Sequence, residues 1–362
     1  MTTITSEEIA FLLNDWYKQI RSHNVSKAEL IRENIHERRD HIRMDQDSHH
    51  FYTLLEFRHH LMTDRFSEYE SLLATVERHR RDLNDTLQYY FHFFKGLYFW
   101  RIGQFTESLE QYRAAEKHIN HVPDHIEEGE FHYRVAAVNY DIGKNVVSIE
   151  HTRKAQYIFN NYIGHGVKYA DCENLLGVNC IAVKQYEDAE QHLITALDIA
   201  QKNNDEDLVT HVKYNLGYLY SEQSLSEVAI RHLNDIYNKQ ADRYKTCFLL
   251  AREYFRVNKN NKAYQMVADG LESCRALNNE EYLHHLNILE AYYSNRELHE
   301  LEPIMRKGID YFNKEDLWAF AQEYSEKLAQ KFYQNRDYEQ ASHYFNISLE
   351  AKRKITEKEA LK

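Results

Sequence analysis

The spacing Glu-x-x-His occurs twice in the sequence, as Glu56 with His59 and as Glu281 with His284. On a helix this spacing places a carboxylate and an imidazole on one face, as in di-iron helical bundles, where further carboxylates complete the ligand set. The two pairs lie far apart in a chain that is rich in both residue types, so chance matches are expected. We therefore predict no metal site and no cofactor.

A polar run that begins at Asp45 also carries groups that could do chemistry, because Gln46 stands between Asp45 and Asp47. Judged by residue types alone, the run is a loop in which Asp47 or Ser48 caps the following helix. The sequence contains neither a Gly-x-Ser-x-Gly elbow nor a glycine-rich phosphate loop that ends in Gly-Lys-Ser/Thr. Motifs alone therefore identify no enzyme.

The composition predicts an all-α protein that does not bind nucleic acid directly. Only 2 Pro and 10 Gly occur in 362 residues, too few turn-forming residues for a chain rich in sheet. Lys plus Arg number 45 against 57 Asp plus Glu, a net charge of −12 that repels a phosphate backbone.

The same sequence predicts a cytoplasmic location and no membrane partner. No apolar run approaches the roughly 20 residues that a membrane helix needs. The first residues have neither the basic nor the apolar region of a signal peptide. The 4 Cys include no Cys-x-x-Cys pair, so we expect reduced thiols.

Residues 1–80 read as a domain of three or four amphipathic helices that form a small bundle. Apolar residues from Ile9 to Ile20 recur at intervals of three and four, which defines one helical face. Ser26, with Glu29 three residues later, has the spacing of a capping box and predicts the start of the second helix.

Residues 81–362 read as tetratricopeptide-type repeats. A small residue recurs in the second helix of each unit with gaps of 40, 41, 40, 34 and 78 residues. The residues that define these gaps are Ser108, Ser148, Ala189, Ala229, Ala263 and Ala341. The last gap is about twice the period, so we expect a degenerate unit near residues 280–310. About seven helix pairs result, forming a right-handed superhelix after the bundle.

Several segments, spread along essentially the whole chain, resemble the Rap proteins of Bacillus and relatives. The segments that carry the resemblance are Asn14–Tyr17, Asp45–Asp47, Phe51–His59, Tyr89–Tyr98, Glu130–Tyr133, Val183–Ala189 and Tyr214–Gly217. The resemblance implies a family that acts in quorum sensing, sporulation and competence.

The resemblance also implies a working surface on the bundle, which binds a response regulator. In phosphatase members, a Gln at the position of Gln46 is thought to orient a water for attack on the regulator's aspartyl phosphate. A neutral amide can hold a water without repelling the phosphoryl charge. By the same resemblance, Asp45, Asp47, His49 and Phe57 are expected to contact the regulator.

A second surface implied by the resemblance lies in the repeats, which bind a short Phr-type signalling peptide that inhibits the protein. The clamp positions of the family match Asn215 and Asn179. An Asn amide can pair with both the N–H and the C=O of an extended peptide backbone.

Two functions remain open, beside a general repeat scaffold. The first is a peptide-regulated aspartate phosphatase, and the second is an inhibitor that sequesters a DNA-binding response regulator without catalysis. This sequence departs from the family after Asp47, where relatives often carry an apolar pair and Ser48, His49 and His50 follow here. It also departs at Ala182 or its neighbour, where relatives often carry an acid. Related peptide sensors carry a DNA-binding helix-turn-helix, but residues 1–66 contain 9 Lys plus Arg against 11 Asp plus Glu, which disfavours that branch.

Overall fold

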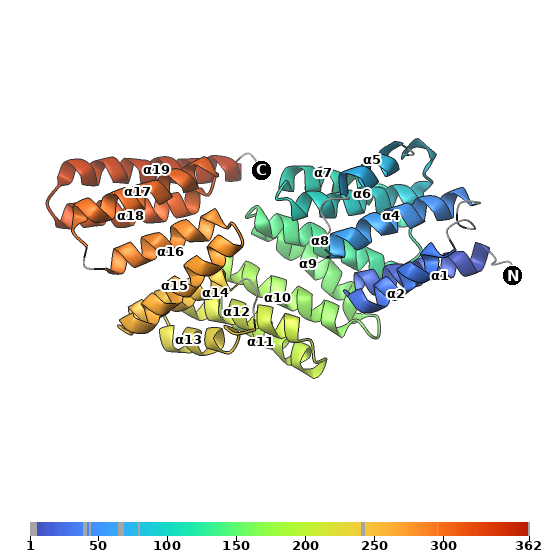
Figure 1. Cartoon of the computed structure of the whole chain (residues 1–362), viewed down its shortest axis with the longest axis horizontal. Helices are drawn as coiled ribbons and strands as arrows, with labels where there is room; N and C mark the ends of the chain where they lie inside the picture. The colour runs from blue at the N-terminus through green and yellow to red at the C-terminus, as the bar shows by residue number, and fades with distance from the viewer. Residues whose placement is uncertain are drawn as a thin grey trace. The chain divides into compact units, whose positions relative to one another are not determined.

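All regular structure in the described residues is helical, and none of it is strand, as the computed structural model shows (Figure 1). The described residues are 6–38, 42, 45–63, 69–78, 80–239, 243–294 and 296–360. The predicted all-α fold class is therefore confirmed. No helix in these ranges combines the length and the apolar character that crossing a bilayer requires.

Four described helices precede the repeats. Their bounds are α1 Ser6–Arg21, α2 Val25–His36, α4 Gln46–Thr63 and α5 Tyr69–Arg78. The side chain of Asn24 caps α2, because its Oδ1 accepts a hydrogen bond from the Lys27 N–H at 3.2 Å. The predicted cap at Ser26 is therefore wrong. His23, with φ 54°, turns the chain directly before Asn24, so α2 starts earlier than the capping-box spacing suggested.

From Asp85 onward the described α-helices form seven consecutive helical hairpins. Their bounds are α6 Asp85–Arg101 and α7 Phe105–Glu116, α8 His125–Asp141 and α9 Asn145–Asn160, α10 Gly166–Ala182 and α11 Tyr186–Lys202, α12 Glu206–Glu222 and α13 Ser226–Asn234, α14 Tyr244–Arg256 and α15 Asn260–Ala276, α16 Glu280–Tyr293 and α17 Leu298–Lys314, α18 Trp318–Gln334 and α19 Tyr338–Ala360. Short 3₁₀ turns lie at Arg80–Asp82 and Ile119–His121.

The periodic small residues lie where the two helices of a pair approach most closely. Each is the fourth residue of its helix, and all six are at most 3% exposed. In the first pair, Ser108 Oγ donates to the Gly96 carbonyl at 2.8 Å. A Cβ on Gly96 would lie only 2.5 Å from the ring of Tyr112, so a larger residue would force α6 and α7 apart.

The degenerate unit is the pair α16 and α17, within the range that the period predicts. Its fourth residue in the second helix is Leu301, which is buried like the small residues elsewhere. A small-residue pattern cannot detect a unit whose contact position holds a leucine.

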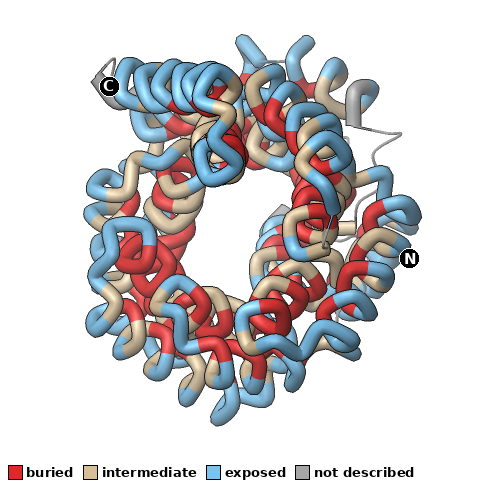
Figure 2. Tube along the Cα trace, turned by 90° about the vertical axis from the view of Figure 1, so that its left-hand side faces the viewer, coloured by how far each residue is buried: buried red, intermediate tan, exposed pale blue. Residues whose placement is uncertain are grey.

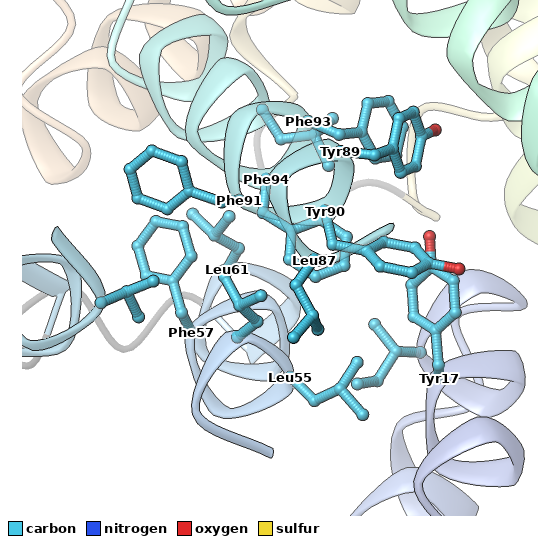
Figure 3. Close-up of a cluster of buried hydrophobic side chains, with 14 of the residues drawn as sticks. Tyr17, Leu55, Phe57, Leu61, Leu87, Tyr89, Tyr90, Phe91, Phe93 and Phe94 are labelled. Atoms are coloured by element: carbon cyan, nitrogen blue, oxygen red, sulfur yellow. The ribbon is translucent and has the colours of Figure 1, made fainter. Parts of the chain in front are cut away.

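The chain divides into two compact units, residues 1–184 and 185–362. The bundle belongs to the first unit together with the first repeat helices, so the domain boundary near residue 80 stays a prediction. In the first unit, aromatic and aliphatic side chains of α1, α4 and α6 form one core (Figure 3). Tyr17 of α1 contacts Tyr90 of α6 edge to face, with 5.3 Å between ring centroids.

Hydrophobic cores also form among the described helices of the second unit. One gathers residues of α13, α14 and α15, including Leu233, Leu250 and Met266. Another joins α16 to α19 around Phe312 and Leu328. Buried and exposed residues alternate along many of the helices, as expected for amphipathic helices in a repeat array (Figure 2).

Candidate functional site

The first turn of α4 presents Gln46 to solvent. Gln46 is the first residue of the helix, is exposed, and makes no side-chain hydrogen bond to a described residue. The carboxylate of Asp45 caps the helix, since its Oδ2 accepts from the Ser48 N–H at 3.0 Å. The predicted cap at Asp47 or Ser48 is therefore wrong, because α4 begins before both residues. Gln46 thus projects from a capped helix and not from a loop.

Asp47 holds this turn against the repeats. Its Oδ2 accepts a hydrogen bond from Asn84 Nδ2 at 2.9 Å. Asn84 is itself the cap of α6, with its Oδ1 accepting from the Leu87 N–H at 3.0 Å. One amide therefore fixes the starts of α4 and α6 relative to each other, which restrains the backbone of Gln46.

Buried polar contacts hold the middle of α4 to α1 and α2. Trp16 Nε1 donates to His59 Nδ1 at 3.2 Å, so the other ring nitrogen of His59 carries the proton and donates to Glu29 at 2.7 Å. Burial lowers the pKa of His59, which keeps the ring neutral. Glu56 forms an ion pair with Arg32 at 2.9 Å. Each side chain of the first Glu-x-x-His match therefore has a protein partner.

The side chains of the second match, Glu281 and His284, also contact other residues of the protein. The His284 ring stacks on Tyr311 with 4.6 Å between centroids, and Glu281 lies 3.9 Å from the Nε2 of His285. Across the described ranges, no three His, Cys, Asp or Glu residues gather as a metal site. The four cysteines are buried and form no disulfide in the part of the chain that the structure describes.

Two of the residues expected to contact a regulator lie differently from Gln46. His49 is half-buried, and its carbonyl accepts from the Thr53 hydroxyl at 2.9 Å. Phe57 is only 2% exposed and lies in the hydrophobic cluster between α4 and α6 (Figure 3). Its ring packs on Tyr98 of α6, with 6.1 Å between ring centroids. Direct contact of Phe57 with a partner does not fit this conformation, because the ring fills the core between α4 and α6.

A buried carboxylate ties α1 to α8, a feature that the sequence analysis missed. Glu127 is fully buried and accepts from the Tyr17 hydroxyl at 2.6 Å and the Tyr89 hydroxyl at 3.1 Å. Its other oxygen pairs with Arg21 at 3.0 Å, and Arg21 also reaches Asp124 at 2.9 Å. More than 100 residues separate Tyr17 and Arg21 from Glu127, so no local pattern could have revealed that α1 contacts α8.

The two Asn residues expected to clamp a peptide belong to different units. Asn179 of α10 has 0% exposure, and its Nδ2 donates to Ser148 Oγ at 2.9 Å and to the Leu175 carbonyl at 2.8 Å. Its Oδ1 has no partner among the described residues, so only an acceptor remains for a ligand. Asn215 of α12 is half-buried.

This arrangement defines a class of protein: a helical-repeat protein whose N-terminal bundle displays an exposed amide between two carboxylates. Residues 3–64 match the family model described as response regulator aspartate phosphatase H, N terminal. The chain belongs to the Rap family.

Curated relatives from Bacillus subtilis (strain 168) align along the full length. Regulatory protein RapG is 28% identical, with the alignment covering 100% of each chain. Response regulator aspartate phosphatase H is 27% identical over 99% of this chain and 98% of its own. These two proteins carry different descriptions at almost equal identity, so identity alone does not distinguish a phosphatase from a regulator of another kind.

Solved structures agree with the fold. A crystal structure of a Rap protein complexed with competence and sporulation factor superposes with a TM-score of 0.84 at 26% identity, covering 98% of this chain and 100% of that one. The apo form of RapI gives a TM-score of 0.71 at 27% identity, covering 96% and 98%.

Proposed function

We propose that this protein binds a bacterial response regulator through the first turn of α4 and removes the phosphoryl group from its aspartate. A short Phr-type peptide bound by the repeats inhibits this activity in the cytoplasm, as part of a quorum-sensing circuit. The observation that carries the proposal is the exposed Gln46, set on a helix start that Asp45 caps and that the Asp47–Asn84 hydrogen bond restrains.

The chemistry asked of Gln46 is positioning. Its amide oxygen accepts a hydrogen bond from a water while its NH₂ donates to a phosphoryl oxygen, and neither group carries a charge that would repel the phosphate. The start of a helix is also the positive end of its dipole, which favours an anion nearby. A restrained backbone matters because a positioned water loses less freedom on reaching the transition state.

The flanking carboxylates suit recognition rather than catalysis. Asp45 and Asp47 are both exposed and would attract basic side chains around the regulator's phosphorylation site. Each carboxylate already has one hydrogen-bonded partner within the protein, so its orientation is fixed before binding.

A purely sequestering inhibitor is the second candidate. The half-buried Ser48 and His49 favour it, because they replace the apolar surface that relatives often place beside the glutamine. Binding through α4 would then suffice to keep the regulator from its target.

The substitution Gln46→Ala separates the two functions. We expect it to abolish phosphate release from a phosphorylated regulator while leaving the affinity for that regulator almost unchanged, since positioning contributes to the transition state. The matched control is Gln104→Ala, an exposed glutamine before α7 without a side-chain capping bond, which should leave both quantities unchanged.

Phosphate release and a binding isotherm are measured for each variant. Equal release by wild type and Gln46→Ala would remove Gln46 from the mechanism. No release from a regulator that the wild type binds would favour sequestration.

A further inference from the structure

A small cavity of about 70 Å³ lies within the first unit, where the bundle packs on the repeats. Arginines contribute much of its lining, together with apolar side chains from α4 and α6. The lining residues are His23, Arg58, Leu61, Met62, Leu97, Trp100, Arg101 and Arg134. The cavity is distinct from the first turn of α4 and from the peptide-clamp positions.

Arg58, on α4, is a buried cation without a carboxylate of its own. It is 8% exposed and forms neither a hydrogen bond nor an ion pair with any described residue. Burial, and then the charge of Arg134, lower the pKa of Arg58. A buried charge without a partner is costly, so an anion at this place would relieve a penalty that the folded chain otherwise carries.

Arg134, on α8, is the second guanidinium that lines the cavity. It lies over the rings of Trp100 and Tyr133, at 6.0 and 5.5 Å from their centroids, and has no ion pair within N···O contact distance among the described residues. Aromatic faces hold a guanidinium in place but do not neutralise it. Its N–H donors therefore remain suited to a ligand.

The nearby carboxylates are already engaged by other cations. Glu127 is paired with Arg21 at 3.0 Å, and Glu130 is paired with Lys168 at 2.9 Å. Both carboxylates act on Arg58 only over a longer range. Glu130 also acts on Arg134 and raises its pKa against the effect of burial, whereas the pKa of Arg58 is lowered, so the unbalanced charge of the cavity lies mainly on Arg58.

We propose that this cavity binds one small oxyanion, such as inorganic phosphate, between Arg58 and Arg134. The planar guanidinium presents parallel N–H donors that match two oxygens of an oxyanion, a geometry that a spherical ion cannot exploit in the same way. The cavity is small, which suits a ligand of a few heavy atoms. Trp100 and Leu97 would shield the ligand and strengthen its ion pairs.

The position of the site gives the ligand a structural consequence. Arg58 belongs to the bundle and Arg134 to the second helix pair, so one anion would bridge the two parts of the first unit. The bridge would lie beside the Glu127 contacts that already join α1 to α8. Bound oxyanion therefore stabilises the packed arrangement of the bundle, whatever reaction the protein performs.

The experiment titrates inorganic phosphate into the full-length protein and follows binding by calorimetry and stability by thermal unfolding. Chloride at matched ionic strength accounts for screening and for the general effect of salt on stability. Wild type should give a saturable one-site isotherm and a melting temperature that rises with phosphate beyond the chloride baseline.

Three variants localise the effect. Arg58→Met and Arg134→Met should each weaken phosphate binding by at least about tenfold, the loss of a charge-assisted hydrogen-bond pair. Arg275→Met, an exposed arginine of α15, should bind phosphate like wild type. If Arg58→Met does not fold, the Arg134→Met variant still tests the site, because Arg134 is only half-buried. An equal response to chloride, or a phosphate response that persists in both cavity variants, would overturn the proposal.

Discussion

Asn84 donates a hydrogen bond from its side-chain amide to the carboxylate of Asp47, 2.9 Å away, and thereby joins the first turn of α4 to the start of α6. The same amide caps α6 through its oxygen. The residue next to Asp47 is Gln46, so the proposed catalytic amide is anchored to the repeats through one side chain.

Substituting Asn84 tests this anchor. Asn84→Asp retains a good helix cap but places a second carboxylate against Asp47, so we expect loss of the link and slower phosphate release, with little loss of stability. Asn84→Ala removes the cap as well and should cost about 0.5 to 2 kcal/mol of unfolding free energy. Denaturant unfolding and phosphate release are measured together. Unchanged release by Asn84→Asp would show that the link does not position Gln46.

The peptide clamp is tested at Asn215. Asn215→Ala should weaken binding of a cognate short peptide by about 1 to 3 kcal/mol, the cost of leaving backbone groups of the bound peptide unpaired. Regulator binding in the absence of peptide should not change. Asn346→Ala, an exposed position on α19, serves as the control. Normal peptide affinity in Asn215→Ala would assign that residue a structural role only.

Asn179 requires a different readout, because its amide already bonds to Ser148 and Leu175. Asn179→Ala leaves the buried hydroxyl of Ser148 without this partner, so we expect a loss of about 1 to 3 kcal/mol of unfolding free energy. Thermal and denaturant unfolding measure it directly. A variant as stable as wild type would argue that Asn179 is free to serve the peptide.

Features that repeat along the chain were predictable from the sequence, whereas contacts between distant residues were not. The small residues from Ser108 to Ala341 predicted the helix pairs, because close helix packing requires a small residue at the same place in each unit. Helix starts were less certain, as Asn24 and Asp45 show, since several neighbouring polar residues could cap equally well. Phe57 carried the family's pattern but fills the core.

The long-range contacts had no sequence signal. Nothing local relates Tyr17 to Glu127 or Arg58 to Arg134, because those pairs depend on how the bundle folds onto α6 and α8. Asp47 and Asn84 are likewise recognisable as capping residues, but their mutual hydrogen bond is not.

Turn residues offer a prediction about stability. The turn before α19 places Arg336 at φ 64°, and the turn before α7 places Gly103 at φ 77°. This conformation costs a residue with a side chain about 1 to 2 kcal/mol, whereas glycine adopts it freely. Arg336→Gly should therefore stabilise the protein by up to about 1 kcal/mol, after the entropy of glycine in the unfolded chain is subtracted.

Two controls fix the interpretation of that change. Arg336→Ala keeps the strained backbone and should not stabilise. Gly103→Ala should destabilise by up to about 1 kcal/mol, the backbone strain less the unfolded-chain entropy that glycine had, because no atom lies within 4 Å of the added Cβ. Chemical denaturation of the three variants gives the comparison. Equal stabilisation by Arg336→Gly and Arg336→Ala would assign the effect to the arginine side chain.

The last prediction concerns acid stability and His285 of α16. This side chain is 2% exposed, lies 4.4 Å from the ring of Phe320, and bonds through Nδ1 to the hydroxyl of Tyr324 at 2.7 Å. Burial, followed by the charges of His284 and Arg252, lowers its pKa to about 3. The folded protein therefore holds His285 neutral, although an unfolded histidine titrates near 6.5.

The sign of the pH effect follows from that difference. Below about pH 6.5 the histidine binds a proton in the unfolded chain but not in the folded protein. The contribution of His285 to the free energy of unfolding is therefore complete above pH 6.5 and is lost as the pH falls toward 3. One such group contributes a slope of about 1.4 kcal/mol per pH unit in this window.

His285→Phe should remove the slope, so that between pH 6.5 and 5 the variant loses about 2 kcal/mol less than wild type. Tyr324→Phe controls for the lost hydrogen bond, because it keeps the histidine and should keep its slope. Urea unfolding at several pH values measures all three proteins. Parallel stability curves for wild type and His285→Phe would show that His285 does not contribute to the acid lability of the second unit.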